Sequence, residues 1–182
     1  MSEQSQDYPW SAKLRLDEVP ESGRHVDLAA DEAARAAVAK AANVDAVEAL
    51  SAAFDLTRRG RDGLRATGTV RATVRQTCVV SLEPVTNTIE EPVEVTFLPP
   101  REAAPGGSEV DVASSGEDDE TEPLVNGAAD LGAVATEFLI LGIDPYPRKE
   151  GVAFTPPAAA TDSAEHPFAA LAALKNASKV KD

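Results

Sequence analysis

The chain has 182 residues, of which 43% are hydrophobic and only 4% aromatic, which is enough for one modest domain with a core of alanine, valine and leucine. The formal net charge of −14 argues against strong non-specific binding of nucleic acid by the whole protein. The single cysteine excludes an intramolecular disulfide and a zinc cluster built from thiolates, and no apolar run approaches the length of a membrane span, so we expect a soluble, cytoplasmic protein.

In chain order, residues 1–7 are predicted to be a disordered polar leader, followed by an α+β core over residues 8–100. Apolar and polar residues alternate from Trp10 to Leu16, and the turn sequence PESG leads to a second short strand over 24–28. We interpret these two segments as an edge hairpin. Residues 30–42 consist almost entirely of helix-favouring residues, with Asn43 as a left-handed stop, and residues 46–57 alternate as a strand.

The clearest pattern runs from Leu64 to Phe97, where fifteen residues of strict alternation are followed by a second alternating run of opposite parity. This predicts an antiparallel hairpin. Matching the apolar residues gives paired residue numbers that sum to 165, with Val70 opposite Val95, Ala72 opposite Val93 and Gly68 opposite Phe97. On the polar face, the same register places Arg71 opposite Glu94 and Arg75 opposite Glu90, and it leaves Glu91 on the inner side near the open end.

Beyond residue 100 the composition changes. Residues 101–123 are poor in apolar residues and carry one basic and eight acidic residues, which predicts an acidic disordered linker. Apolar residues recur at helical spacing from Asp130, so residues 124–147 are predicted to hold a helix that completes the core and ends before Pro145 and Pro147. Residues 148–182 are predicted to be a flexible tail with a short helix at 167–175.

No group of residues predicts catalysis, a cofactor or a metal site. His25 and His166 are far apart in sequence, Asp118 and Asp119 are best interpreted as solvating charge, and Cys78 as a small core residue. We therefore expect a protein that is not an enzyme and has no small-molecule substrate.

The basic residues between positions 57 and 75 form the sharpest candidate site, since six arginines stand there with only Asp62 as an acidic neighbour. Cross-strand pairing with Glu90 and Glu94 would account for two of them. The others are candidates to contact RNA phosphate, an acidic protein or the chain's own acidic segment. No aromatic residue accompanies them, which argues against base-specific recognition of single strands. The candidates are Arg58, Arg59, Arg61, Arg65, Arg71 and Arg75.

A second candidate is the predicted tail helix, on which Phe168, Leu171 and Leu174 form a small apolar face. Packing on the chain's own domain and binding to a partner protein are equally compatible with that face.

Two motifs, TCVVSLEPV and DPYPRK, together with the acidic insertion and the closing PFAALAALK, resemble the YceD family of large ribosomal RNA subunit accumulation proteins, most closely its alphaproteobacterial-type members. The resemblance covers roughly residues 8–175. It implies a cytoplasmic, non-enzymatic factor in ribosome biogenesis. The motif residues that carry over are Cys78, Leu82, Glu83, Pro84, Asp144, Pro145, Tyr146 and Pro147.

This chain departs from many relatives, which have a second cysteine three positions after the one that matches Cys78 and, in some, a further pair near the C-terminus. Here Ser81 stands at the first of these places, so a metal or redox role cannot carry over.

We therefore expect an α+β fold with an antiparallel sheet of about five strands, curled toward a barrel, and two covering helices. The functional hypothesis is a biogenesis factor that contacts large-subunit pre-rRNA or an early ribosomal protein, with the arginines as the surface for RNA. The alternative is a protein-only adaptor or holdase whose acidic linker and C-terminal helix bind a basic partner.

Overall fold

The computed structural model describes residues 8–100 and 121–155. The predicted leader, most of the acidic linker and the tail with Phe168, Leu171 and Leu174 lie outside the described residues, as do Asp118, Asp119 and His166. The chain divides into two compact units, residues 1–152 and 153–182, and every described helix and strand belongs to the first. Its elements are β1 (Lys13–Arg15), the 3₁₀ helix η1 (Leu16–Glu18), β2 (Arg24–Ala29), α1 (Glu32–Ala41), β3 (Ala46–Arg59), β4 (Gly63–Thr77), β5 (Pro84–Leu98), β6 (Thr121–Pro123), β7 (Ala128–Asp130) and α2 (Leu131–Gly142).

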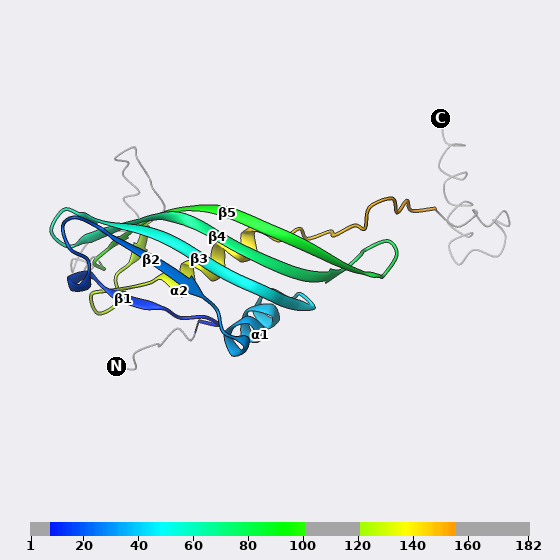
Figure 1. Ribbon diagram of the computed structural model, residues 1–182, viewed down its shortest axis with the longest axis horizontal. Helices are drawn as coiled ribbons and strands as arrows, with labels where there is room; N and C mark the ends of the chain where they lie inside the picture. Colours follow the sequence, from blue (N-terminus) through cyan, green and yellow to red (C-terminus); the bar gives the residue numbers. More distant parts are fainter. Residues whose placement is uncertain (1–7, 101–120, 156–182) are drawn as a thin grey trace, which may run out of the picture. The chain divides into compact units, whose positions relative to one another are not determined.

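The main sheet has five strands in the order β2-β3-β4-β5-β6, and both helices lie on one of its faces (Figure 1). The predicted α+β class, the strand number and the two helices are confirmed. The sheet stays open, because its edge strands β2 and β6 do not pair with each other, so the predicted curl toward a barrel does not extend to closure. One further difference is that β6 pairs with β5 in the parallel direction, and β6 occupies the last three residues of the segment predicted as linker.

The predicted edge hairpin between the first two strands is wrong. β2 pairs with β3, whereas β1 pairs with β7 in a separate two-stranded sheet in which Leu14 lies opposite Ala129. The alternation itself was correctly interpreted, since Trp10 and Leu14 are buried and their polar neighbours are exposed. Alternation identifies the buried face of a strand but says nothing of its partner.

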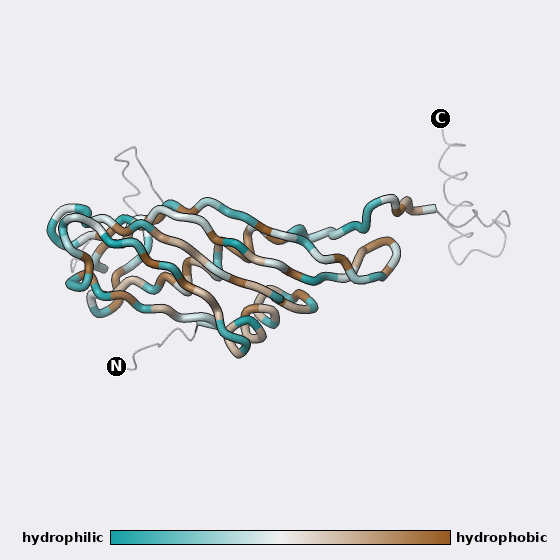
Figure 2. Tube along the Cα trace, in the orientation of Figure 1, coloured by the Kyte–Doolittle hydropathy of each residue, from teal (hydrophilic) through white to brown (hydrophobic). Residues whose placement is uncertain are grey.

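The central hairpin forms as predicted, but its register differs by four residues. Paired numbers sum to 161, so that Ala66 lies opposite Val95, Gly68 opposite Val93 and Ala72 opposite Ile89. The predicted sum of 165 is therefore wrong, although the faces are right because a shift of four residues keeps each side chain on its side of the sheet. Figure 2 shows the resulting alternation of hydrophilic and hydrophobic residues along the strands.

The core lies between the inner face of the sheet and the two helices. The largest fully buried side chains on the sheet include Phe54, Leu56 and Phe97, and α1 and α2 contribute Val38 and Leu139. Both predicted helices are confirmed with shorter bounds, and each begins at an aspartate whose carboxylate accepts a backbone N–H of the first turn. These caps are Asp31 and Asp130. Asn43, with a φ of 54°, follows α1 as the expected left-handed residue.

Candidate binding surfaces

Two of the six candidate arginines are held by the fold itself. The Nε atom of Arg58 donates to the Val19 carbonyl at 2.7 Å and its Nη2 atom to the Leu16 carbonyl at 3.1 Å. Arg59 donates to the hydroxyl of Thr96, which is fully buried, at 3.0 Å. These guanidinium groups anchor η1 and the end of β5 to the end of β3, so they have structural partners that the sequence did not reveal.

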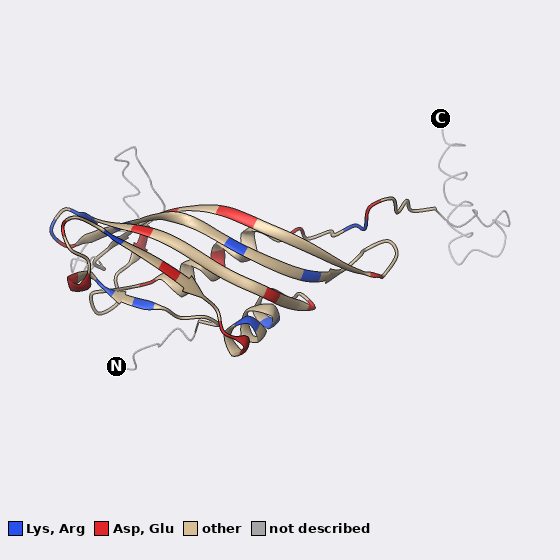
Figure 3. Ribbon diagram, in the orientation of Figure 1, with Lys and Arg blue, Asp and Glu red and all other residues tan. Residues whose placement is uncertain are grey.

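Three further arginines form cross-strand ion pairs on the uncovered face of the sheet. Arg71 binds Glu90 at 2.7 Å, Arg65 binds Glu94, and Arg75 lies 3.3 Å from Glu48. The predicted pairs of Arg71 with Glu94 and of Arg75 with Glu90 are therefore wrong, as the shifted register requires. The pKa of Glu90 is lowered by the hydrogen bond from Arg71 and by its charge. Figure 3 shows basic and acidic residues interspersed along the strands of the sheet.

Arg61 differs from the others. It is exposed in the turn between β3 and β4, and within residues 8–100 and 121–155 it makes no hydrogen bond or ion pair. The arginine surface therefore consists mainly of side chains already engaged by carboxylates or carbonyls, with Arg61 as the cation available at its end.

The two family-type motifs, far apart in sequence, contact each other directly. The Val79 N–H donates to the Pro147 carbonyl at 3.0 Å, the Lys149 ammonium binds Glu83 at 3.0 Å, and the Gln76 amide donates to the Asp144 carbonyl at 2.9 Å. We call this set of contacts between residues 76–84 and 144–149 the clasp. It joins the β4–β5 turn to the segment that follows α2.

Cys78 lies inside the clasp and is fully buried. Its thiol receives a hydrogen bond from the Ser81 side chain and backbone N–H groups of Ser81, Lys149 and Val80, each N···Sγ distance being 3.4 Å. These interactions lower the pKa of Cys78 to about 6, against the opposing effect of burial. The interpretation of Cys78 as a small buried residue agrees with its burial. Its pKa is lowered chiefly by Ser81, three residues along the chain, and Lys149 adds a hydrogen bond from a distant segment.

Three apolar side chains of the clasp are exposed to solvent. The exposed fraction is 46% for Val79, 77% for Leu82 and 70% for Tyr146. Leu82 has a φ of 61°, a left-handed conformation that a leucine adopts at a cost of roughly 1–2 kcal/mol. Hydrogen bonds from the Leu82 N–H to the Cys78 carbonyl and from the Tyr146 N–H to the Asp144 carboxylate fix both backbones. We call the surface formed by Val79, Leu82 and Tyr146 the tip. It presents apolar side chains on a backbone that hydrogen bonds hold in place.

Gln76 and Lys149 were not among the predicted site residues. A signal for Gln76 was present, because it is the one polar side chain among the inward positions of β4, and a polar residue there needs a buried hydrogen-bond partner. Lys149 is the last residue of the motif DPYPRK, but its contact with Glu83 depends on the path of the chain after α2.

His25 lies on the uncovered sheet face between two carboxylates, with its Nδ1 atom 2.7 Å from Asp55 and its Nε2 atom 3.4 Å from Asp27. The hydrogen bond with Asp55 raises the pKa of His25, and Asp27 adds to the effect. No group of His, Cys, Asp and Glu among the described residues is arranged to hold a metal ion. The carboxylates instead bind opposite ring nitrogens and stabilise a charged imidazole.

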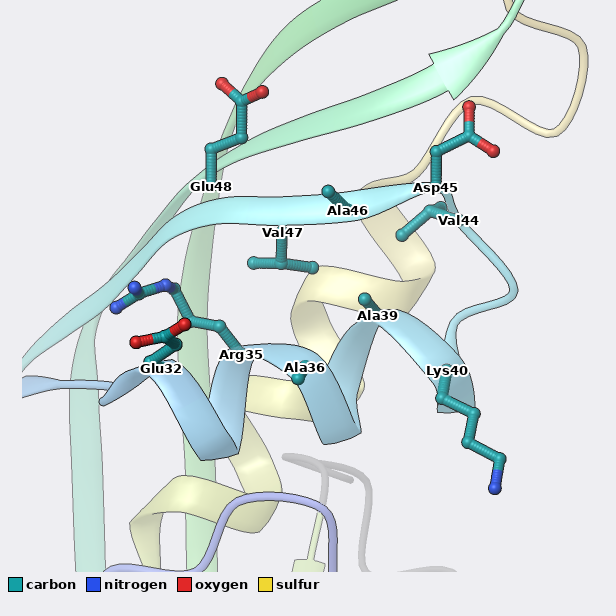
Figure 4. Close-up of a pocket in the computed structure, with 10 residues that line it drawn as sticks. All are labelled: Glu32, Arg35, Ala36, Ala39, Lys40, Val44, Asp45, Ala46, Val47 and Glu48. Carbon is teal, nitrogen blue, oxygen red and sulfur yellow. The ribbon is translucent and has the colours of Figure 1, made fainter.

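An open cavity of about 450 Å³ lies between α1 and the start of β3 (Figure 4). Its walls combine small apolar side chains with both carboxylates and cations, and Arg35 is engaged by the Ala30 carbonyl. The cavity has no cluster of convergent polar groups that would orient a ligand. The lining residues are Glu32, Arg35, Ala36, Ala39, Lys40, Val44, Asp45, Ala46, Val47 and Glu48.

The open five-stranded sheet, the helices on one face and the clasp between two distant motifs define an α+β protein that presents fixed loops at one end of its central hairpin. A family model described as large ribosomal RNA subunit accumulation protein YceD matches residues 66–175. Because this match covers more than half of the 182 residues, the chain belongs to the YceD family. Neither the curated proteins nor the solved structures include a significant match. In the described parts of the chain, no helix is both long and apolar enough to cross a membrane.

Proposed function

We propose that the protein is a non-catalytic, cytoplasmic factor in large ribosomal subunit biogenesis, and that it acts by binding an early ribosomal protein through the tip formed by the clasp. Membership of the YceD family supports a role in the accumulation of large-subunit ribosomal RNA. The observation that carries the proposed surface is the contact between the two motifs, both of which lie within the matched residues 66–175.

The character of the tip favours a protein partner. Leu82, Tyr146 and Val79 present apolar surface, which gains free energy when it leaves water against another apolar surface. Their backbones are fixed by hydrogen bonds before any partner arrives, so binding orders little of this chain. An exposed leucine held in a left-handed conformation is also an unfavourable choice for a loop with no other role.

Direct contact with pre-rRNA through the arginine surface is the second candidate. Arg61 supports it as an exposed cation, and the ion pairs of Arg65, Arg71 and Arg75 are half exposed, so phosphate groups could compete for them. The notion of an adaptor that binds a basic protein through residues 101–123 and the Phe168 helix rests on the sequence alone.

Leu82→Asn separates binding from folding at the tip. Asparagine tolerates the left-handed conformation, so this change removes the apolar side chain while the free energy of unfolding stays the same or rises slightly. Leu82→Met keeps the apolar character and is the matched control. Arg61→Glu tests the arginine surface in the same assay.

The assay is sedimentation of the tagged full chain from lysate through a sucrose gradient, with and without RNase. We expect the wild type and Leu82→Met to comigrate with immature large subunits, and Leu82→Asn to remain at the top. Retained comigration of Leu82→Asn, combined with loss for Arg61→Glu and after RNase, would refute the tip and favour RNA contact. Wild-type protein that stays at the top in both gradients would refute stable association with the subunit.

A further inference from the structure

Helix α2 has the composition of a helix that is covered on every side. Its twelve residues, LGAVATEFLILG, include a single charged residue, Glu137, and its other polar side chain, Thr136, is buried and donates to the Gly132 carbonyl. A helix that is hydrophobic all round normally lies inside a protein rather than at its surface.

In the part of the chain that the structure describes, the sheet and, at Gly132, residues 10–12 cover α2 on all but one side. Its buried side contacts the sheet, and Gly142 lies so close to β5 that an added Cβ atom would be 2.7 Å from Glu91. The opposite side exposes Glu137, 40% of Ile140 and 70% of Leu141. With half-buried Ala133, these residues follow the i, i+4, i+7, i+8 spacing of one helix face, which we call the α2 face.

The charges around the α2 face are all negative along its own segment. Glu137 is the charged residue of this face, and no lysine or arginine occurs from Asp130 to Pro147. The last turn of α2 also has no basic residue to balance the negative end of the helix dipole. A partner that carries phosphate is disfavoured at this surface, whereas a cationic one is favoured.

We infer that the α2 face is a docking site for a basic amphipathic helix of a partner protein. The apolar side of that helix packs on Ile140 and Leu141, and its lysines or arginines reach Glu137 and the carbonyls at the end of α2. This inference does not depend on the proposed function, because the residues of the α2 face, Ala133 to Leu141, lie outside the clasp.

The test uses the full chain and fluorescence anisotropy of a labelled designed helix of about 18 residues, with leucines on one side and lysines on the other. Two comparison peptides replace its lysines by glutamates or its leucines by serines. Two protein variants alter the face, Leu141→Ser and Glu137→Lys. Their matched controls are Val125→Ser, which changes another exposed apolar residue, and Glu21→Lys, which changes the net charge equally at a distant turn.

We expect the leucine–lysine peptide to bind, the comparison peptides to bind at least about tenfold more weakly, and each α2-face variant to lose about tenfold in affinity. The controls should change affinity by less than about twofold. Equal losses for Glu21→Lys and Glu137→Lys would show attraction by net charge only and overturn the proposal. Equal binding of the glutamate peptide, or binding that appears only after residues 156–182 are removed, would also overturn it.

Discussion

Arg58 provides the sharpest test of how the basic segment is used. Its guanidinium donates to the carbonyls of Val19 and Leu16 at 2.7 and 3.1 Å, and the first of these bonds is partly buried. A hydrogen bond from a charged donor contributes roughly 1.5–3 kcal/mol when shielded and less when exposed. Arg58→Ala should therefore lower the free energy of unfolding by about 2 kcal/mol, since both carbonyls lose a donor beside the fully buried side chain of Val19.

The assay is urea unfolding followed by circular dichroism, with thermal unfolding as a second measurement. The loss for Arg58→Ala corresponds to a fall in Tm of roughly 8 °C for a domain of this size. Arg61→Ala is the matched control, and we expect its effect to stay within about 0.5 kcal/mol because it removes no partner. Arg58→Lys should fall between the two, since an ammonium cannot reproduce the forked geometry.

Equal stability of Arg58→Ala and Arg61→Ala would refute the assignment of Arg58 as a structural anchor. If the anchor is correct, reversing Arg58, Arg59 and Arg61 together to glutamate is a poor test of RNA binding, because loss of association would follow from loss of folding. The single variant Arg61→Glu avoids this problem, since its side chain is exposed in a turn.

Three further measurements check the site geometry. The pKa of Cys78, measured from its thiolate absorbance, should be about 6, and a midpoint near 9 would contradict this result. The hydrogen bonds to the thiolate therefore add stability that is fully present above the ordinary thiol pKa and is lost as the pH falls through about 6. The pKa of His25, followed by NMR, should lie above 6.5 and fall back toward 6.5 in Asp55→Asn. The stability contributed by the ion pair of His25 with Asp55 is present below pH 6.5 and is lost as the pH rises through the raised pKa of His25. Gly68→Ala should cost about 1–3 kcal/mol in urea unfolding, because the new Cβ atom would lie 2.0 Å from the Ala53 carbonyl oxygen; a loss below about 0.5 kcal/mol would show that the strands move apart freely.

The strands and helices of the core could be predicted because their signals are local. The alternation that predicted β3, β4 and β5 depends only on which side of each strand is buried, and the caps and alanines of α1 mark its ends within a few residues. Pairing partners are not local. β1 pairs with β7 more than a hundred residues away, and nothing in either three-residue strand identifies the other.

The register of the central hairpin could not be predicted from the alternation of apolar and polar residues. Every odd sum of paired numbers keeps the even positions of β4 and the odd positions of β5 on the same face, so the alternation alone cannot choose between 165 and 161. The choice is made at the turn, where the Cys78 N–H donates to the Glu83 carbonyl at 2.8 Å and closes a loop over residues 78–83. The clasp holds that loop in place through residues 144–149, and Gly142 leaves space for Glu91 on the inner face.

The observed register also explains why the net charge of residues 57–75 overestimates the positive charge of the arginine surface. Residues 57–75 carry six arginines and one aspartate in sequence, but folding brings Glu48, Glu90 and Glu94 onto the same face. A phosphate that approaches Arg65, Arg71 or Arg75 must displace a carboxylate already bound there, so the gain from each contact is the difference between two anionic partners. Because long-range attraction depends on net local charge, the interspersed carboxylates also weaken any steering of RNA toward this face. The apolar tip suffers no such competition, and for this reason the physical argument for a binding surface is stronger at the clasp than along the strands.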